Sequence, residues 1–469
     1  MAAWTCSPGR RGELAFAASD LCGLPRAGGP ESVRLDWTVI PAILSAPGLA
    51  ADRTALNVES VAPGAMQPLG GSRGDAVALW RPADFVGSDL AHADDLAAQL
   101  RACVERSVDG LAADGRFSVE VSGGLDSAIV AAALMRTGRR AQVAEAVNYH
   151  ARSVLADERD WARAVCGHLD LPLRCVPRVT PPWREEDYAE LSRHARPPVN
   201  ALDTPRDRLG ADLARRAGAT AIFSGKGGDG VFFQRATALV LADRAQADGP
   251  QALLTPFARE TARWLRRSIW SVGWEAARAA KAPPGRYAAG LGAHPWLYDL
   301  EALPPGKRFQ VAALAAAQGH RGVNRRTLTA DVLHPLLSQP VMELCLAIPS
   351  WRLVEDSGTL HGRALARRAF SDSLPATVVW RRSKGDLTTH YSRWIAASRD
   401  SLLPVLRDGV LADAGLVDRA AVAEALDPDR LIYRSDARGL LSAAALEFWI
   451  RHWQGRVPDL GRRPSVDSA

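Results

Sequence analysis

The chain has 469 residues, of which 47% are hydrophobic and 23% are charged, a balance that indicates a folded protein with a sizeable core. This composition excludes a disordered tail. The formal net charge of +6 comes mostly from arginines spread along the whole chain, so it does not predict a nucleic-acid partner.

Cysteine usage and apolar runs bear on the cellular compartment. The six cysteines form no C-x-x-C pair and lie mostly in apolar surroundings, as free thiols do in a reducing compartment: Cys6, Cys22, Cys103, Cys166, Cys175 and Cys345. They predict neither a zinc site nor a disulfide framework. The first residues carry no continuous apolar stretch behind a basic start, and no later window reaches about eighteen uncharged apolar residues. We expect a cytoplasmic protein with no membrane partner.

The first part of the chain, residues 1–85, is rich in Gly, Pro and Ala and contains short apolar runs such as "VRLDWTVI" and "AVALW". These runs predict a few strands in a small, partly β domain. From residue 86 the pattern turns helical, with Leu96, Leu100, Cys103 and Val104 on one helical face. We expect a domain boundary near residue 85 and one larger domain over residues 86–469.

Strand and helix candidates alternate in the core of that larger domain, residues 110–235. In chain order they are "FSVEV", "AIVAAAL", "AQVAEAVNYH", "DERDWARAVCGHLD", "LPLRCVPRV", "RDRLGADLARRAG" and "ATAIFSG". Such alternation predicts an α/β fold with a parallel sheet and right-handed crossovers. The remainder, residues 236–469, has a mostly helical pattern with Pro-rich breaks.

A glycine-rich turn, "SGGLDS", lies between a predicted strand and the start of a helix. Glycines let backbone N–H groups converge on an anion, and the helix N-terminus adds its positive dipole end, so the turn predicts a phosphate site. The spacing and lysine of a Walker loop are absent. An aspartate would repel phosphate without a cation between them, which favours Mg²⁺. A plain capped turn is the structural alternative, but it would need neither both glycines nor both serines; the residues are Ser122, Gly123, Gly124, Leu125, Asp126 and Ser127.

A second glycine-rich segment, "IFSGKGGDGVFF", again follows a predicted strand. Loops at the carboxyl ends of neighbouring parallel strands meet at one edge of the sheet, where ligands bind in open α/β folds. Asp126 and Asp229 could then hold one Mg²⁺ on a shared pyrophosphate, although an exposed aspartate in a flexible loop would show the same local pattern. The candidate pyrophosphate-binding residues are Ser224, Gly225, Gly227 and Gly228.

SGGLDS followed about a hundred residues later by SG-x-GGD resembles the PP-loop ATP-pyrophosphatase fold, as used in the synthetase domain of asparagine synthetase-like proteins. The resemblance implies ATP and Mg²⁺ as cofactors. It implies that ATP is cleaved between the α and β phosphates, that a carboxylate is activated as an acyl-adenylate, and that an amine displaces AMP. By the same resemblance the first loop holds pyrophosphate, and Asp126 and Asp229 hold the metal.

The segments 333–351 and 362–386 are similar to the corresponding region of lasso peptide cyclases, which are macrolactam synthetases of ribosomal peptide biosynthesis. The stretch Ser383, Lys384, Gly385 is the most specific piece, and the resemblance implies that Lys384 contacts the phosphates. A fixed ammonium near the α-phosphate would stabilise the transition state of adenylation more than the ground state. A solvated basic turn is the alternative, since Arg381 and Arg382 precede it.

Three further residues are second-rank candidates. Arg363 and Arg367 are spaced i, i+4 on a predicted helix and could bind phosphate or a peptide carboxylate, or could simply flank an apolar stripe. Glu158 could act as general base for the attacking amine. Asp157 as helix N-cap with Asp160 in the first turn would explain the acidic pair structurally.

The chain also departs from glutamine-dependent asparagine synthetases. Position 2 is Ala2 rather than the nucleophilic cysteine, and the first 85 residues are few for a glutaminase domain, so we expect a reduced remnant of one. In the second loop, Lys226 and Gly230 stand where asparagine synthetases carry glutamates. The loss of both carboxylates suits a nucleophile that arrives already tethered, such as the α-amine of a peptide.

These observations predict an ATP-dependent carbon–nitrogen ligase that closes a macrolactam ring in a leader-free precursor peptide, with a leader peptidase and a leader-binding protein as partners. A small-molecule amide ligase, similar to asparagine or β-lactam synthetases, would share every phosphate-site residue. A tRNA-modifying PP-loop enzyme would be expected to carry a basic domain or loop cysteines. Finally, Trp264, Ile269, Trp270 and Trp274 lie at helical spacings and predict core packing of a helical subdomain.

Overall fold

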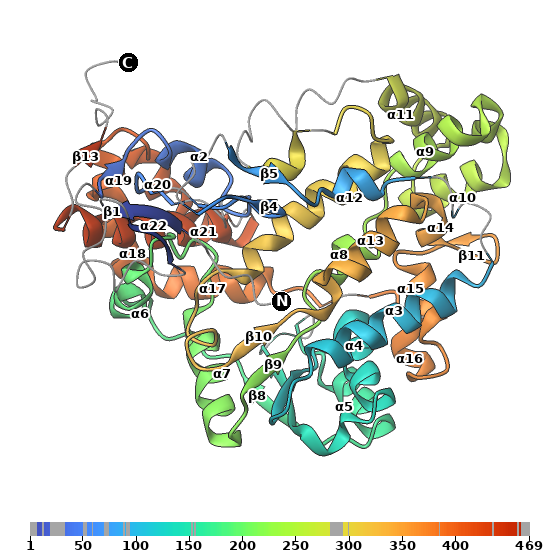
Figure 1. The fold of residues 1–469 in the computed structure, drawn as a ribbon, viewed down its shortest axis with the longest axis horizontal. Helices are drawn as coiled ribbons and strands as arrows, with labels where there is room; N and C mark the ends of the chain where they lie inside the picture. Colours follow the sequence, from blue (N-terminus) through green and yellow to red (C-terminus); the bar gives the residue numbers. More distant parts are fainter. Residues whose placement is uncertain are drawn as a thin grey trace.

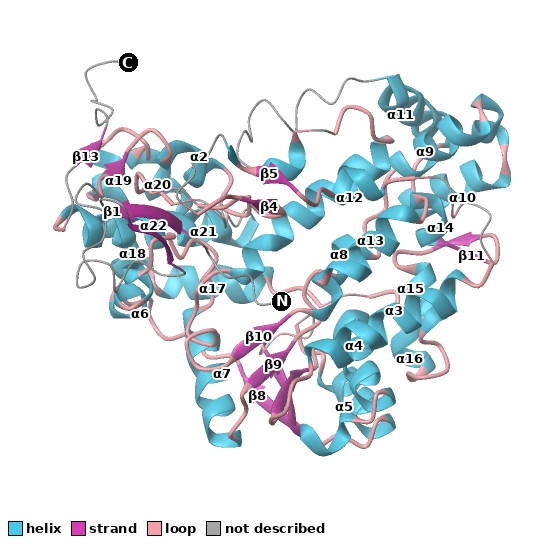
Figure 2. Ribbon diagram, in the orientation of Figure 1, coloured by secondary structure: helices cyan, strands magenta, loops and turns pink. Residues whose placement is uncertain are grey.

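The structure is a computed structural model. It describes residues 7–11, 14–18, 33–49, 54–58, 60–69, 75–87, 90, 94–151, 153, 156–281, 294–298, 300–383, 385–433, 436–456 and 459–460. Within these ranges it is a mixed α/β protein in which one parallel sheet and several short strand pairs lie among helices (Figure 2). The predicted fold class is confirmed.

A five-stranded parallel sheet forms the centre of the α/β part. Its strands lie in the order β10 (Asp331–Leu333), β9 (Ala221–Phe223), β6 (Phe117–Glu120), β7 (Val143–His150) and β8 (Leu173–Pro177). The three strands predicted after "FSVEV" are β7, β8 and β9. Because β6, β7 and β9 are largely buried, they match the pattern expected of parallel strands covered on both faces.

Helices α4 (Leu125–Arg136) and α5 (Arg159–His168) lie on one side of this sheet, and α7 (Thr204–Ala217) lies on the other (Figure 1). Every residue of α4 from Ala128 to Leu134 has 0% exposure, because the helix is enclosed between the sheet and α3 (Leu96–Leu111). A helix that is apolar all round is stable only in such a buried place. The glycine loop that precedes α4 is therefore attached to a rigid element.

The order of the strands creates a switch point. From β6 the chain proceeds to β7 and β8 on one side, then returns through α7 to β9 and β10 on the other side of β6. In open α/β sheets the crevice beyond the carboxyl ends of the strands at such a point is the usual ligand site. Both predicted glycine loops start there, because one follows β6 and the other follows β9.

The rest of the described chain is mostly helical, as predicted. Its helices are α2 (Ile40–Ser45), α6 (Glu186–Ala189), α8 (Gly228–Val231), α9 (Leu239–Asp248), α10 (Pro256–Leu265), α11 (Ile269–Lys281), α12 (Pro305–Ala317), α13 (Gln339–Ala347), α14 (Ser350–Val354), α15 (Ala364–Ala369), α16 (Ala376–Val379), α17 (Thr388–Ala397), α18 (Arg399–Arg407), α19 (Val410–Asp413), α20 (Arg419–Ala425), α21 (Pro428–Tyr433) and α22 (Ala437–Gln454).

The N-terminal segment has short strands, as predicted. They are β1 (Ser7–Arg11), β2 (Leu14–Ala18), β3 (Leu35–Asp36), β4 (Ala65–Met66) and β5 (Val77–Ala78). Strand β3 pairs with β13 (Asp459–Leu460), and Leu35 and Trp37 share a buried cluster with Trp449 and Ile450 of α22. A two-stranded ribbon, β11 (Glu355–Asp356) and β12 (Thr359–Leu360), completes the strands. The domain boundary near residue 85 stays a prediction.

Two local predictions are corrected. Only Leu35–Asp36 of the run "VRLDWTVI" forms a strand, because α2 already begins at Ile40. The second correction concerns the tryptophans, because Trp270 and Trp274 are 82% and 65% exposed rather than part of the core.

A break in the helix explains the exposed tryptophans. Arg266 adopts a left-handed conformation with φ 54°, so α10 ends at Leu265 and α11 begins a new helical phase. The buried face of α11 then carries Val272 and Ala276, which places Trp270 and Trp274 on the opposite face.

Candidate active site

The first glycine loop joins β6 to α4 and is held in shape by its own serines. The Ser127 hydroxyl accepts from the Ser122 N–H at 3.1 Å and lies 3.0 Å from the Ser122 hydroxyl, which in turn accepts from the Gly124 N–H. Gly123 has φ +85°, and a Cβ there would lie 2.7 Å from the carbonyl oxygen of Glu158. Leu125 is buried in the core, so only its backbone can face a ligand. The loop therefore presents mostly backbone atoms in front of α4.

The second glycine loop follows β9 and lies directly against the first. A Cβ at Gly225 would lie 2.3 Å from the Ser127 backbone nitrogen, and one at Gly228 would lie 2.4 Å from the Asp126 carboxylate carbon. These approaches are possible only without a side chain. Gly225 and Gly228 thus have a structural reason, which is the contact between the two loops.

Asp126 and Asp229 converge on the same point. One guanidinium nitrogen of Arg363, Nη1, donates to Asp126 Oδ2 at 2.8 Å and to Asp229 Oδ1 at 3.1 Å. Carboxylate oxygens are the ligands that Mg²⁺ prefers, and it is often bound by one or two carboxylates plus phosphate oxygens and water. Among the described residues there is no cluster of three or more His, Cys, Asp and Glu that could hold a metal. The two aspartates fit a magnesium ion that takes its other ligands from the nucleotide.

The two second-rank arginines differ in what they contact. Arg363 is buried, has φ 61°, and reaches the two aspartates. Arg367 instead donates to the carbonyl oxygens of Gly362 and Val379, and burial lowers its pKa to about 10, with a further contribution from Arg363. Arg363 is therefore the one that faces the predicted metal site, while Arg367 holds the chain around it.

The segment after α16 is fixed to the first glycine loop through Glu158. Arg381 donates to Glu158 Oε1 at 2.6 Å and to the Gly123 carbonyl at 3.2 Å, and its guanidinium lies 3.7 Å from the centre of the Trp161 ring. The Gly385 N–H also donates to Glu158 Oε1, at 3.2 Å. Lys384 lies outside the described residues, and its role stays a prediction.

These contacts give Glu158 a structural task. It is also the N-cap residue of α5, although its side chain makes no capping bond, whereas Asp157 accepts from the Arg159 N–H and guanidinium. The N-cap is thus one residue later than predicted. Glu158 as general base stays a prediction, and its ion pair with Arg381 is a reason to look for another base.

A cavity of about 850 Å³ opens beyond the carboxyl ends of the strands. It is lined by every predicted residue of the two loops except Gly123 and Gly228, and by Glu158, Arg363 and Arg367. The structure therefore brings the described candidate residues of both loops to one cavity.

On another part of its wall the cavity carries a group of paired charges that we call the ionic cluster: Glu120, Arg206, Asp207 and Arg326. Arg206 and Arg326 donate to Glu120 Oε1 at 2.7 and 2.8 Å, and Arg326 Nε donates to Asp207 at 2.8 Å. Burial alone would raise the pKa of Glu120, but the two guanidiniums outweigh it and lower the pKa to about 2. For Asp207 burial prevails and raises the pKa. The cluster holds the base of the cavity wall together across β6, α7 and the segment before β10.

Ser224 is buried, and its hydroxyl lies 2.7 Å from His334 Nδ1 and accepts from the Lys226 N–H. His334 Nε2 lies 3.2 Å from the His320 carbonyl oxygen. Burial lowers the pKa of His334 to about 4, so its ring is neutral at neutral pH. Ser224 thus shapes the second loop with its side chain.

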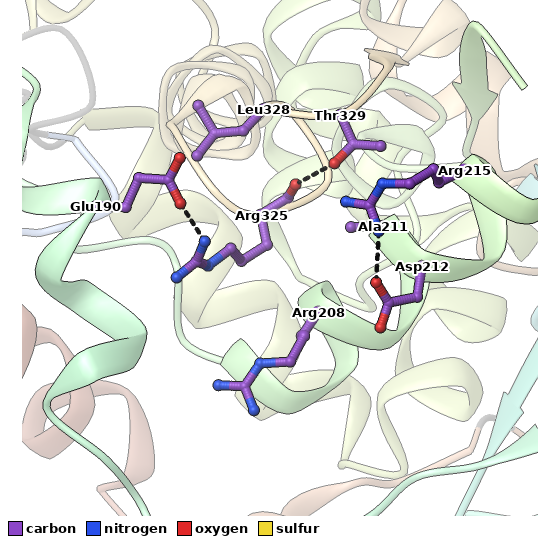
Figure 3. A pocket seen from close by; sticks show the side chains of 8 residues that line it. All are labelled: Glu190, Arg208, Ala211, Asp212, Arg215, Arg325, Leu328 and Thr329. Carbon is purple, nitrogen blue, oxygen red and sulfur yellow. Dashed lines mark hydrogen bonds and ion pairs between the residues drawn. The ribbon is translucent and has the colours of Figure 1, made fainter.

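A second, smaller cavity of about 300 Å³ lies beside α7, and none of the described candidate residues lines it (Figure 3). Its arginines are paired with acids: Arg325 with Glu190, Arg215 with Asp212, and Arg208 with Asp187. Because each arginine has an acidic partner, this set of ion pairs gives no sign of an anion site.

The residues that sequence reasoning missed are those of the ionic cluster. Glu120 pairs with Arg206 and Arg326 across 86 and 206 residues of chain. A single sequence carries no signal for such distant pairs. The one local hint is a carboxylate at the end of an otherwise apolar strand, since a buried carboxylate needs a partner.

Comparison with known proteins agrees with this architecture. Residues 96–451 match the protein family described as Asparagine synthase. This match covers most of the chain, and the protein belongs to the asparagine synthase family. No curated protein matches the chain.

Family membership defines the general class of reaction. It implies an ATP-dependent ligase that forms amide bonds, in a family whose enzymes use ATP, generally with Mg²⁺. The predictions of an asparagine synthase-like fold and ligase class are confirmed at that level. Within the described residues, none of the helices combines the length and apolar character needed to cross a bilayer.

Proposed function

We propose that the protein is an ATP- and Mg²⁺-dependent macrolactam synthetase of lasso peptide biosynthesis. A side-chain carboxylate of Asp or Glu in the leader-free core peptide is adenylated, and pyrophosphate leaves. The peptide's own N-terminal amine then attacks the acyl carbon, an isopeptide bond forms, and AMP leaves.

The observation that carries this proposal is the composition of the second glycine loop. Lys226 and Gly230 line the cavity at the two positions where asparagine synthetases carry glutamates. A wall without those carboxylates suits a nucleophile delivered by its own peptide rather than free ammonia. The similarity of the segments 333–351 and 362–386 to lasso peptide cyclases supports the same substrate.

Each part of the site has a role in this reaction. The two glycine loops bind pyrophosphate, and Asp126 and Asp229 hold Mg²⁺, which supplies charge neutralisation on the phosphate oxygens. Lys384 stabilises the charge that develops at the α-phosphate. Holding the amine beside the acyl-adenylate removes an entropic barrier of about 7 to 11 kcal/mol at best.

The substrate of this reaction also implies partners. A leader peptidase must expose the amine before the ring can close, and a leader-binding protein would deliver the precursor to it. A short precursor gene and a small peptidase gene beside this one would support the proposal.

A small-molecule amide ligase is the second candidate. The observation in its favour is Arg438 on the cavity wall, which could hold the carboxylate of a free amino acid. Its adenylation would occur with free aspartate and without any peptide.

The experiment is mass spectrometry of a leader-free candidate peptide incubated with the protein, ATP and Mg²⁺. The proposal predicts loss of one water from the peptide together with AMP, and loss of both products in Asp126→Asn and Lys384→Ala. Asp160→Asn is the matched control, because this aspartate of α5 is exposed and its side chain pairs with Arg163. If AMP forms with free aspartate while the peptide stays unchanged, the small-molecule ligase is favoured. If neither AMP nor the dehydrated peptide forms when the protein is folded and its peptidase is supplied, the macrolactam reaction is refuted.

A further inference from the structure

Lys226 is the lysine that the described structure places on the cavity wall, in the middle of the second glycine loop. The residue before it, Gly225, touches the backbone of Ser127, and Gly228 touches Asp126. Arg206, Glu120 and Arg326 of the ionic cluster act electrostatically on Lys226. It therefore lies beside both the predicted phosphate site and the ionic cluster, in the cavity where the proposed reaction would occur.

The carboxylates on the described cavity wall are all committed to arginines. Each accepts a hydrogen bond from a guanidinium: Glu120 from Arg206, Asp126 and Asp229 from Arg363, Glu158 from Arg381, Asp203 from Arg178, and Asp207 from Arg326. An arginine partner favours the charged form of a carboxylate and weakens it as a proton acceptor, although at Asp207 burial outweighs the arginines and raises the pKa. Because each of the six is already paired with a guanidinium, none is as open to the attacking amine as an unpaired group.

The two histidines of the wall are equally unsuited. His334 has both ring nitrogens near polar atoms, the Ser224 hydroxyl and the His320 carbonyl. Burial lowers the pKa of His320 to about 3, with smaller contributions from Lys226 and His334. An imidazole with so low a pKa does not hold the proton of an ammonium group at neutral pH.

Lys226 differs from these groups. In the part of the chain that the structure describes, its Nζ has neither a hydrogen-bond nor an ion-pair partner, and the side chain remains accessible within the cavity. Enclosure by the cavity walls lowers its pKa to about 8, as does Arg206, while Glu120 opposes the shift. The other charged or titratable groups that face it are Arg326, Arg178, His320 and His334. A growing fraction of Lys226 is therefore a neutral amine as pH rises through about 8.

We propose that Lys226 is the general base of the amide-forming step. The neutral Nζ takes a proton from the attacking amine as the amine nitrogen bonds to the acyl carbon, and the bond from that carbon to the phosphate oxygen breaks. AMP leaves with the electron pair, and Lys226 leaves the step as an ammonium that returns its proton to water. This inference rests on the proposed amide-forming function and adds to it the residue that accepts the proton.

Two substitutions separate proton transfer from charge. Arginine at this position keeps the positive charge but cannot be deprotonated in a protein, whereas methionine removes both. A base role predicts that Lys226→Arg and Lys226→Met both lose about 10²- to 10⁴-fold in amide formation. A purely electrostatic role predicts that Lys226→Arg stays close to wild type. Lys281→Met, at the exposed end of α11, is the matched control.

Hydroxylamine provides the readout that isolates the step. It is largely unprotonated at neutral pH and attacks an acyl-adenylate without a base, so hydroxamate formation reports adenylation alone. The inference predicts that both Lys226 variants lose amide formation at least about tenfold more than hydroxamate formation. Equal losses in the two assays would overturn it. If the wild-type protein forms no hydroxamate with any of the carboxylates tested, the proposed function fails instead.

A titration tests Lys226 independently of any substrate. The chain contains only four lysines, so the ε-carbon signals of ¹³C-labelled lysine can be assigned from single variants. The inference predicts that the signal lost in Lys226→Met titrates near pH 8, below the ordinary value of about 10.4. A signal that titrates at the ordinary value would overturn it.

Discussion

At the glycine loops, the groups that face the cavity are backbone atoms and two aspartates. These groups come from segments directly after neighbouring strands. In the ionic cluster, by contrast, charged side chains from β6, α7 and the segment before β10 pair with one another before any substrate arrives. The loops are thus predicted to receive an anion, whereas the charges of the cluster are already paired with one another. Substitutions in the two regions should therefore affect different properties, catalysis for the loops and stability for the cluster.

The largest effect is expected in the ionic cluster. Glu120→Gln leaves the buried Arg206 and Arg326 with Asp207 as their one remaining charged partner in the cluster, and breaking a buried ion pair in this way costs about 3–5 kcal/mol. Urea denaturation at pH 7 measures the loss. Glu275→Gln, in an exposed pair with Arg267, should cost less than about 1 kcal/mol.

The pH dependence of this loss has a definite sign. The pKa of Glu120 is lowered in the folded state to about 2, from an ordinary value of about 4.3, so its stabilising effect is complete above the higher value. It is lost as pH falls from about 4.3 toward about 2. The difference in free energy of unfolding between wild type and Glu120→Gln should therefore become smaller between pH 5 and pH 3. A difference that stays constant over this range would contradict the ion-pair explanation.

The second effect is expected at the glycine loops and concerns catalysis. A methyl group at residue 225 would lie 2.3 Å from the Ser127 backbone nitrogen, so Gly225→Ala must push the two loops apart. Displacement by about 1 Å costs about a hundredfold in rate, which ATP–pyrophosphate exchange would measure. Gly167→Ala in α5 is the control, because a Cβ there meets no neighbour within 4 Å. Exchange at the wild-type rate in Gly225→Ala would break the proposed division between the two regions.

The smallest effect is expected on α11, outside both regions. Trp270 is 82% exposed, so Trp270→Ser should change the free energy of unfolding by no more than about 0.5 kcal/mol. Trp296→Ser is the contrasting variant, because the Trp296 side chain is buried and packs against Trp80. Its free energy of unfolding should fall by about 3–5 kcal/mol. Similar losses in both variants would restore the core position that the sequence pattern predicted for Trp270.

The same two regions mark how far sequence reasoning reaches. The parallel sheet, both glycine loops and the meeting of Asp126 with Asp229 could be predicted, because each depends on a short segment and on the rule that strand ends share one edge. The pairing of Glu120 with Arg206 and Arg326 could not, since it depends on how distant segments cross. The break at Arg266 that exposes Trp270 was also hidden, because arginine at positive φ has no distinct sequence signature.

The arginine that bridges the two aspartates is an intermediate case. The spacing of Arg363 and Arg367 predicted a shared helix face, but α15 begins only at Ala364 and Arg363 lies just before it. Its left-handed backbone directs it to Asp126 and Asp229, whereas Arg367 contacts carbonyl groups. Which of the two arginines faces the predicted metal site could be decided only from the structure.

The most direct test of the central claim is to identify the products of ATP by ³¹P NMR, with Mg²⁺ and a candidate peptide or small carboxylate. A ligase that adenylates a carboxylate at the two glycine loops predicts AMP and pyrophosphate from wild type and neither from Asp126→Asn. ADP and inorganic phosphate, or AMP formation that survives Asp126→Asn, would contradict that claim.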